Sequence, residues 1–365
     1  MINYVDLMIA SFIALISTFL LTFVIRKLAF TFNFVDKPNH RKIHKETVPR
    51  IGGLGIFIGA AIGLLYLLPE HIHLTGIGLG ALIIVLTGML DDRYDIRPII
   101  KLTGQLIAAS FLISSGLIIE RVTLPLFGMI DLGAFSVLIT ILWVVGITNA
   151  INLIDGLDGL ATGVSTIALL SMFVMALIDL QIFAAYLCIV LIGANLGFLY
   201  HNFFPAKIYM GDTGSNFLGY MIAVISMLGL FKNIALFSFV IPVIVLAIPI
   251  FDTLFAIVRR ASNKQKITMA DNKHIHYQLL SAGFSHRVTV IIIYGFSSIF
   301  GILAIVFSEA SFLVSAIVTV FAIFLIHILA ELAGVVLGGK RPVVDSVLRI
   351  LHIKNSKKEK SNIEE

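Results

Sequence analysis

The sequence predicts an all-α polytopic membrane protein with about eleven transmembrane helices, an outer N-terminus, a cytoplasmic C-terminus and an active site at the cytoplasmic face. Hydrophobic residues make up 59% of the 365 residues and charged residues only 13%, and the mean hydropathy is +1.03. This number of charged side chains is too small to cover the surface of a soluble protein. The apolar excess must therefore face lipid. This composition also excludes a disordered chain and a disulfide scaffold, since Cys188 is the single cysteine.

A spanning helix needs about 20 mostly apolar residues, and the charged clusters divide the chain into segments of this kind. The first segment begins without a basic region and is too long for a signal peptide, so we interpret it as a retained span. The predicted spans lie near residues 4–25, 51–69, 74–90, 102–119, 134–150, 159–178, 182–201, 214–231, 234–257, 288–307 and 311–336.

The basic residues give the orientation, because Lys and Arg accumulate on the cytoplasmic side of membrane proteins. All but Arg121 and Lys232 of the 26 Lys and Arg residues fall in alternate gaps or in the C-terminal tail. The net charge of +5 therefore follows from topology and attraction to anionic lipid, and we predict no nucleic-acid binding. On the outer side, residues 120–133 fit either a small hairpin or a plain loop.

Two adjacent carboxylates follow the third span, in the sequence DDRYD (91–95). A solvated loop is the simplest interpretation. However, Asp91 and Asp92 at a membrane interface would repel each other and lose hydration, which favours a bound cation or a proton-transfer role. Lys101, at the start of the next span, would by itself be a snorkelling lysine.

The segment NAINLIDGLDG (149–159) follows the fifth span. Its polar side chains recur at every third residue: Asn149, Asn152, Asp155 and Asp158. In a continuous helix they would line one face, whereas Gly156 and Gly159 would permit a break and the close approach of a ligand. The pattern of an EF-hand calcium loop is absent, and a structural cap is the remaining alternative. Such a polar stripe beside lipid favours ligand binding.

Two further segments suit phosphate. In MGDTGS (210–215), Asp212 would either cap the following helix or belong to a backbone-donor site for phosphate at the helix N-terminus. His274 and His276 form an HxH pair among basic residues. A structural zinc site is disfavoured because no third soft ligand is nearby, so phosphate coordination fits this pair better.

Glycines at 52–63 indicate close helix packing rather than a nucleotide loop, since no strand and no complete glycine fingerprint accompany them. Seven carboxylates gather at predicted cytoplasmic helix ends: Asp91, Asp92, Asp95, Asp155, Asp158, Asp212 and Asp252. Carboxylates among basic loops are what a diphosphate bridged by Mg²⁺ needs. We therefore predict one soluble anionic substrate and one carried by a lipid.

Five stretches resemble, in order, the motifs of the polyprenyl-phosphate N-acetylhexosamine-1-phosphate transferases, and the resemblance extends to about residue 330. They are DKPNHRKIH (36–44), DDRYD (91–95), NAINLIDGLDGL (149–160), MGDTGS (210–215) and HIHYQLL (274–280). The resemblance implies transfer of a sugar-1-phosphate from a UDP-sugar to undecaprenyl phosphate in the bacterial cytoplasmic membrane, with release of UMP. It also implies that Mg²⁺ is required, with Mn²⁺ as a substitute.

The matching positions imply the roles of individual residues. The implied catalytic residues are Asp91, Asp92, Asp155 and Asp158, with Asp91 as the base that activates the lipid phosphate. The implied metal ligand is Asp212, with Asp92 and Asp155 as further candidates. The implied substrate-binding residues are Lys101, His274 and His276 for the diphosphate, and Asn152, Gly156, Leu157, Asn202 and Tyr209 for the nucleotide, with Tyr209 stacking on uracil.

Such a transfer needs alignment and charge stabilisation as the lipid phosphate attacks the β-phosphorus. Asp91 would act as a base or as a covalent nucleophile, and we favour direct attack because the phosphate is already ionised near pH 7. Within the family, DDRYD and the pattern HIHxxLLxxGFSHR (274–287) resemble UDP-GlcNAc enzymes of the teichoic-acid-initiating type. The enzyme that uses UDP-MurNAc-pentapeptide is the alternative. Tyr277 departs from the usual final His of the HIHH motif, and we expect His274 and His276 to matter more.

A transporter or flippase is the alternative from another class, but transporters carry ionisable groups near the bilayer midplane in repeated, broken helices. We predict a single catalytic membrane domain over residues 1–338 and a basic, partly disordered tail over 339–365. The expected partners are the UDP-sugar, undecaprenyl phosphate and the lipid bilayer, and a homodimer is left open.

Overall fold

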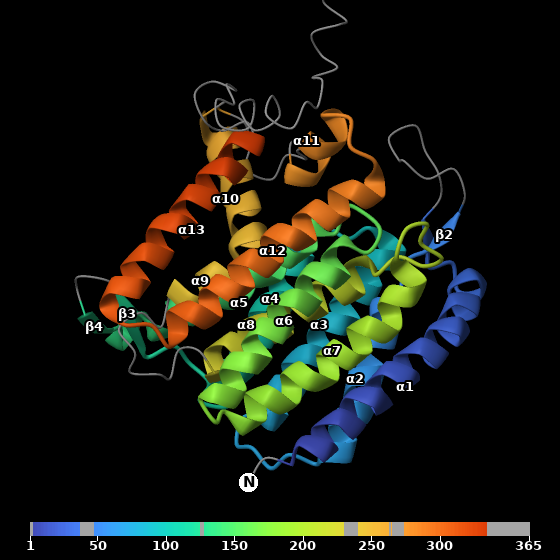
Figure 1. The fold of residues 1–365 in the computed structure, drawn as a ribbon. Coiled ribbons are helices and arrows are strands. Elements are labelled where there is room, and N and C mark those ends of the chain that lie inside the picture. The colour runs from blue at the N-terminus through green and yellow to red at the C-terminus, as the bar shows by residue number, and fades with distance from the viewer. Residues whose placement is uncertain are drawn as a thin grey trace, which may run out of the picture.

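The computed structural model describes residues 3–36, 47–124, 128–229, 240–262, 264 and 274–333. These residues form helices packed side by side, with two small antiparallel hairpins (Figure 1). The helices are α1 (Tyr4–Thr31), α2 (Gly53–Leu67), α3 (Leu74–Tyr94), α4 (Pro98–Ser114), α5 (Ser136–Ile154), α6 (Leu160–Ile178), α7 (Ile182–Asn202), α8 (Gly211–Gly229), α9 (Val240–Val245), α10 (Ala247–Ser262), α11 (Ile275–Ser281), α12 (His286–Ser308) and α13 (Phe312–Leu332), with a 3₁₀ turn at Gly133–Phe135.

Every predicted apolar segment overlaps at least one helix. In the described part of the chain, seven helices are long and apolar enough to cross a membrane, namely α1, α3, α5, α6, α7, α12 and α13. Helices α2 and α4 are apolar but shorter, with 15 and 17 residues. The chain is therefore a mostly helical, multi-pass membrane protein. The ninth predicted segment is divided between α9 and α10, and the sequence did not predict the short α11.

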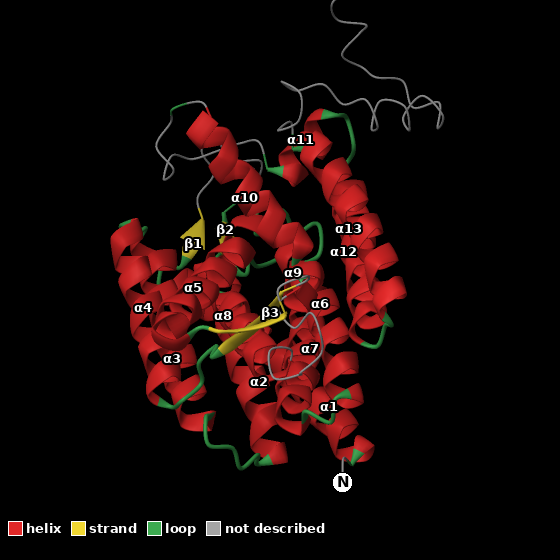
Figure 2. Cartoon of the chain, turned by 90° about the vertical axis from the view of Figure 1, so that its left-hand side faces the viewer, coloured by secondary structure: helices red, strands yellow, loops and turns green. Residues whose placement is uncertain are grey.

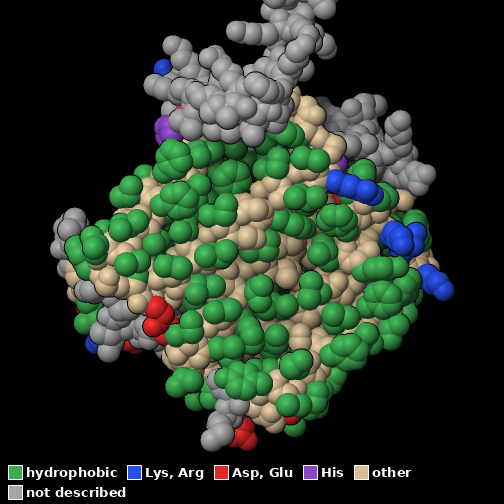
Figure 3. All heavy atoms as spheres, in the orientation of Figure 1, with side chains coloured by type: hydrophobic (Ala, Val, Ile, Leu, Met, Phe, Trp, Pro, Cys, Tyr) green, Lys and Arg blue, Asp and Glu red, His purple; other side chains and the backbone are tan. Residues whose placement is uncertain are grey.

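Large apolar side chains are exposed on the outer helices. Phe12 on α1 is 64% exposed, Ile302 on α12 is 61% exposed and Val320 on α13 is 69% exposed. In Figure 3 hydrophobic side chains are spread over most of the visible face, and charged side chains lie near its margins. A continuous apolar surface of this extent requires a lipid environment.

Helix α8 lies at the centre of the bundle, in contact with α2, α3, α5, α6 and α7. All of its residues except Asp212 are buried. Figure 2 shows the surrounding helices running beside one another, with α11 and the end of α10 at the end opposite the N-terminus. Because α8 is enclosed on every side, the helices around it determine where its first residues lie.

Glycines allow α2 and α3 to approach the start of α8 very closely. A Cβ atom on Gly53 would lie 2.1 Å from the Cα atom of Gly214, and one on Gly88 would lie 2.5 Å from the Cα atom of Thr213. Similarly, a Cβ on Gly59 would lie 1.9 Å from the hydroxyl of Thr18 on α1. The prediction that the glycines at 52–63 pack helices together is confirmed.

Residues 120–133 form a hairpin, which is one of the two alternatives that the sequence left open. Strand β3 (Arg121–Leu124) pairs antiparallel with β4 (Gly128–Asp131). The other hairpin joins β1 (Val35–Asp36) and β2 (Val48–Pro49). The predicted tail at 339–365 and the end of the predicted domain at 338 lie outside the described residues.

The glycine contact between α2 and α8 predicts a specific loss of stability. Substituting Gly53→Ala places a methyl group against the backbone of α8, and we expect a cost of about 1–3 kcal/mol. Gly78→Ala in α3 is the matched control, because a Cβ at Gly78 meets no atom within 4 Å. Thermal unfolding of the purified variants should show a lower midpoint for Gly53→Ala only; equal midpoints would contradict this packing.

Candidate active site

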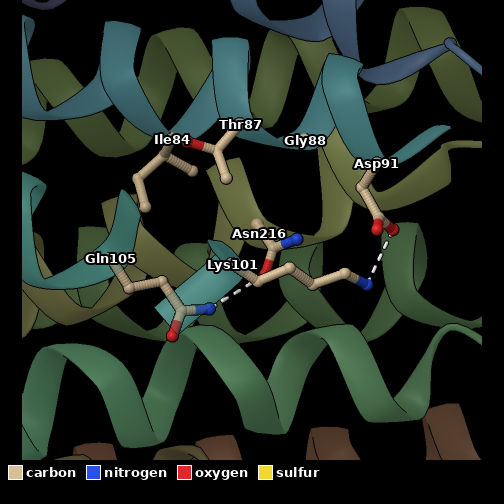
Figure 4. A pocket seen from close by; sticks show the side chains of 7 residues that line it. All are labelled: Ile84, Thr87, Gly88, Asp91, Lys101, Gln105 and Asn216. Atoms are coloured by element: carbon tan, nitrogen blue, oxygen red, sulfur yellow. Dashed lines mark hydrogen bonds and ion pairs between the residues drawn. The ribbon is translucent and has the colours of Figure 1, made fainter. Parts of the chain in front are cut away.

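Charged side chains from α3, α4 and α8 meet around one ammonium group. Lys101 Nζ lies 2.6 Å from Oδ2 of Asp91 and also pairs with Oδ2 of Asp212. Figure 4 shows Lys101 on α4 reaching across toward Asp91 on α3. Their side chains are largely enclosed, so the electrostatic interactions are screened less than in bulk water. These three residues, far apart in the sequence, therefore form one cluster.

Asp92 caps the beginning of α8 from the neighbouring helix α3. Its Oδ1 accepts the backbone N–H of Asp212 at 2.8 Å. Its Oδ2 accepts the backbone N–H of Thr213 at 2.9 Å and the Thr213 hydroxyl at 2.6 Å. The first N–H groups of a helix have no partner within the helix and carry a partial positive charge. The carboxylate of Asp92 satisfies them and thereby fixes the position of Asp212.

Gly211 makes this arrangement possible. Its φ angle is +71°, which favours glycine, and a Cβ atom there would lie 2.5 Å from Oδ2 of Asp92. The carboxylate can approach the helix end only because this position has no side chain. The two glycines that flank Asp212 thus serve different purposes, since Gly214 packs against Gly53 of α2.

Arg50, which follows β2, is the main site residue that sequence reasoning missed. Its Nε lies 3.1 Å from Oδ1 of Asp92, and its Nη2 lies 3.5 Å from Oδ1 of Asp212. Burial opposes its charge, but Asp92 and Asp212 raise the pKa of Arg50 above its ordinary value. In the sequence Arg50 counted only as one more basic residue of a loop. Its position directly before Ile51-Gly52-Gly53 was the available signal.

The polar stripe after the fifth span is interrupted rather than continuous. Helix α5 ends at Ile154 and α6 begins at Leu160, after Gly159 with φ +77°. Asn152 still faces the cluster, since its Nδ2 donates to Oδ1 of Asp212 at 3.1 Å. Asp155 lies on the turn, where burial and the charge of Asp212 raise its pKa to about 7. The break therefore brings the turn 155–159 beside the start of α8.

Asp158 and Asn202 tie that turn to the loop 203–210. Asp158 Oδ2 accepts the backbone N–H of Ala206 at 2.9 Å. Asn202 Oδ1 accepts the Gly159 N–H at 3.1 Å, and Asn202 Nδ2 donates to the Ile208 carbonyl at 3.1 Å. Asn202 is 3% exposed, so its contacts hold the two loops in place. The predicted contact of Asn202 with the nucleotide stays a prediction.

Tyr209 and Leu157 differ in what they offer to a ligand. Tyr209 is half-buried, its backbone pairs with Pro49 and Gly52, and burial raises the pKa of its phenol. Leu157 is 5% exposed and belongs to the hydrophobic core. Its side chain is therefore directed into the protein, and only the backbone of the turn 156–158 would lie along a nucleotide.

His276 on α11 reaches the same turn, and His274 is the residue directly before α11. A Cβ atom on Gly156 would lie 2.3 Å from Nε2 of His276, so the imidazole packs directly against the turn. Tyr277, at the position where the family motif has a final His, packs against His276 with ring centroids 4.2 Å apart. The structure thus brings His276 next to Gly156, with the ring of His274 stacked beside that of His276, and their contact with diphosphate stays a prediction.

A pocket opens next to Asp91 and Lys101, between α3, α4 and α8. It is lined by Ile84, Thr87, Gly88, Asp91, Lys101, Gln105 and Asn216 (Figure 4). Gln105 and Asn216 were not predicted as site residues. Their side-chain amides belong to a chain of hydrogen bonds next to the charged cluster. Asn149 on α5 donates to Gln105 on α4 at 2.8 Å, and Gln105 donates to Oδ1 of Asn216 on α8 at 3.4 Å. These bonds connect α5, α4 and α8 behind the charged groups.

The oxygen donors suit a hard divalent cation that shares its ligands with a substrate. Among the described residues, no group of three or more His, Cys, Asp or Glu side chains is arranged to hold a metal ion alone. Asp91 and Asp212 nevertheless converge on one cation, the Lys101 ammonium. Mg²⁺ commonly binds through one or two carboxylates plus phosphate oxygens and water. The donor set therefore fits Mg²⁺ bound together with a phosphate substrate.

Comparisons with known proteins assign the family. The model of Glycosyl transferase family 4 matches residues 74–230. The chain is 44% identical over 334 residues to the probable undecaprenyl-phosphate N-acetylglucosaminyl 1-phosphate transferase of Bacillus subtilis, covering 91% of this chain and 93% of the relative. The chain belongs to glycosyl transferase family 4, and it is a sugar-1-phosphate transferase.

Two more distant relatives carry related names. The decaprenyl-phosphate N-acetylglucosaminephosphotransferase of Mycolicibacterium smegmatis is 35% identical over 79% of each chain. The undecaprenyl-phosphate alpha-N-acetylglucosaminyl 1-phosphate transferase of Yersinia pestis is 30% identical over 74% of this chain and 76% of its own length. The resemblance inferred from the five motifs is confirmed by these relatives.

The two adjacent carboxylates should respond differently to substitution. Asp92→Ala leaves the start of α8 and Arg50 without their partner, and losing one member of a buried charged pair costs roughly 3–5 kcal/mol. Asp91→Ala removes a carboxylate that caps no helix, so its thermal midpoint should stay closer to that of the wild type. Thermal unfolding of both variants tests this, and similar midpoints would refute the capping role of Asp92.

Asp155 predicts a pH dependence of stability. Its folded pKa, raised by burial to about 7, lies above its ordinary value of 3.8, so the folded state retains a proton that the unfolded state has lost. This contribution is fully present below about pH 4 and is lost progressively as the pH rises from there to about 7. In metal-free buffer, the midpoint of Asp155→Asn should fall less between about pH 5 and about pH 7.5 than the wild-type midpoint. Parallel curves would contradict the raised pKa.

Proposed function

We propose that the protein transfers N-acetylglucosamine-1-phosphate from UDP-GlcNAc to undecaprenyl phosphate, forming undecaprenyl-diphospho-GlcNAc and UMP. The observation that carries this proposal is the convergence of Asp91, Lys101 and Asp212 at the ends of apolar helices. A lipid substrate reaches such a position from the bilayer and a nucleotide reaches it from water. The relatives are named for this reaction on undecaprenyl or decaprenyl phosphate.

The reaction forms one bond and breaks one. An oxygen of the lipid phosphate attacks the β-phosphorus of UDP-GlcNAc, and the bond from that phosphorus to the bridging oxygen breaks, so UMP leaves with the bond electrons. Catalysis of phosphoryl transfer rests mainly on alignment and on stabilising charge. Lys101 supplies a positive charge at the cluster, and Asp91 beside it would accept the remaining proton of the lipid phosphate.

Among the protein groups, Asp212 would hold Mg²⁺, or Mn²⁺ in its place, with Asp155 close by on its turn, which leaves Asp91 available as the base. A bound divalent cation would neutralise phosphate charge and polarise the phosphorus that is attacked. Asp92 is engaged in four contacts with Arg50, Asp212 and Thr213. Its contacts therefore favour a role in positioning Asp212, in place of the implied roles in lipid activation and metal binding.

We further infer a bacterial cytoplasmic membrane location, with eleven spans, an outer N-terminus and a cytoplasmic C-terminus. The distribution of charge supports this orientation. On the face shown in Figure 3, Lys and Arg side chains gather near the end that carries β2, away from the N-terminus. The site lies at that end, since Arg50 directly follows β2. The homodimer and the basic tail stay predictions.

The product would begin a cell-wall glycopolymer, and we propose the teichoic-acid pathway. Phospho-MurNAc-pentapeptide transfer in peptidoglycan synthesis is the alternative activity, and a membrane lipid or sugar transporter is the alternative class. The names of the relatives specify N-acetylglucosamine, which favours GlcNAc-1-phosphate transfer over phospho-MurNAc-pentapeptide transfer. The position of the charged cluster at helix ends, away from a bilayer midplane, favours an enzyme over a transporter.

Release of UMP by the purified protein tests the proposed function. With undecaprenyl phosphate and Mg²⁺, we expect UMP from UDP-GlcNAc and none from UDP-MurNAc-pentapeptide. Asp212→Ala should abolish release, because the proposed metal ligand is lost, whereas Asp131→Ala in the distant hairpin should retain it. Turnover of the pentapeptide substrate alone would refute the donor, and absence of UMP with both donors would refute the activity.

A further inference from the structure

A buried carboxylate to which the sequence motifs assign no individual role holds His274. Asp252 lies on α10 and is 3% exposed. Its Oδ2 lies 2.9 Å from Nδ1 of His274, and its Oδ1 accepts the backbone N–H of Ile275 at 3.0 Å. Because the two oxygens of one carboxylate bind consecutive residues, Asp252 fixes the His274 ring and the first residue of α11 together.

This contact determines how His274 presents its second nitrogen. A carboxylate oxygen accepts hydrogen bonds, so the pairing places a hydrogen on Nδ1 of His274. The nitrogen left for a substrate is then Nε2, which donates to a phosphate oxygen when it also carries a hydrogen, that is, in the imidazolium form that a paired carboxylate favours. Carboxylates that bind the far side of a functional imidazole in this way orient the ring and set its tautomer. The geometry of Asp252 and His274 is of this kind.

His276 has unmatched polar atoms beside the same turn. Its ring is parallel to that of His274, with centroids 5.8 Å apart and 4° between the planes. The side chain is 1% exposed, and neither ring nitrogen has a hydrogen-bond partner among the described residues. A buried polar group without a partner costs roughly 1–3 kcal/mol. An anionic ligand seated against Gly156 would supply the missing partner.

We propose that Asp252 is a positioning residue of the donor site. It holds His274 through Nδ1 and α11 through Ile275, so that the imidazoles of His274 and His276 bind diphosphate oxygens of the nucleotide-sugar beside the Asp155–Gly156 turn. The inference rests on the proposed function, because it takes a UDP-sugar as the donor. Asp252 itself contacts no substrate and acts through the two histidines.

The KM values for the two substrates test this role. Asp252→Asn keeps an oxygen for the Ile275 N–H, but its amide nitrogen cannot accept the hydrogen of Nδ1. In UMP-release assays on the full-length protein, KM for UDP-GlcNAc should rise about tenfold or more, with KM for undecaprenyl phosphate within about twofold of wild type. Asp252→Glu, which keeps the carboxylate, should recover part of the loss. An unchanged donor KM, or equal changes in both KM values, would overturn the proposal.

A double-mutant comparison separates positioning from general stabilisation. In a His274→Ala background, Asp252→Asn should change the donor KM by less than about twofold, because its target is already missing. A full additional loss there would overturn the proposal. Glu331→Gln is the matched control: Glu331 is a buried acid 3.3 Å from Nε2 of His327 on α13. This control should leave both KM values unchanged.

Direct binding distinguishes this inference from the proposed reaction. If the wild type releases no UMP, the proposed function fails, and calorimetric titration with UDP-GlcNAc still measures donor binding. Asp252→Asn should then weaken binding about tenfold, and Glu331→Gln should not. Equal affinity of wild type and Asp252→Asn for UDP-GlcNAc would overturn the role of Asp252, whichever reaction the enzyme performs.

Discussion

Both carboxylate oxygens of Asp92 accept hydrogen bonds from the first turn of α8, and much of the site depends on this contact. The first N–H groups of a helix that is buried at nearly every residue are shielded from water, so they need a partner from the protein. Asp92 provides that partner from α3. Because Asp92 holds the backbone of Asp212, the same contact also places the Asp212 carboxylate beside Lys101.

The close packing around α8 is what allows the charged side chains to gather at its N-terminus. Glycines at 53, 88 and 211 bring α2, α3 and the Asp92 carboxylate within reach of the helix end. Carboxylates gathered so closely repel each other in a medium of low dielectric constant. Arg50 and Lys101 offset this repulsion.

Sequence reasoning recovered the helices and most of the cluster. Long apolar segments are a local property, so hydropathy located them, and the motifs around Asp91, Asn152, Asp212 and His274 identified regions that the fold brings together. Arg50 and Gln105 were not predicted as site residues, and Asp252 was only counted among the seven carboxylates, without a role of its own. Their roles arise from contacts with residues between 22 and 162 positions away, and no local pattern records such pairing. The polar residues at 149–158 were compatible with a continuous helix or with a break at the glycines. The structure has the break, and Asn202 on α7 stabilises it by accepting the N–H of Gly159.

The central claim is that Asp212, fixed by the cap on α8, binds a divalent cation together with the donor diphosphate. Mn²⁺ in place of Mg²⁺ makes this binding visible by electron paramagnetic resonance. The account predicts that wild-type protein with UDP-GlcNAc binds Mn²⁺, that Mg²⁺ displaces it, and that Asp212→Ala abolishes the binding while Asp131→Ala retains it. Undiminished Mn²⁺ binding by a folded Asp212→Ala protein would contradict the account.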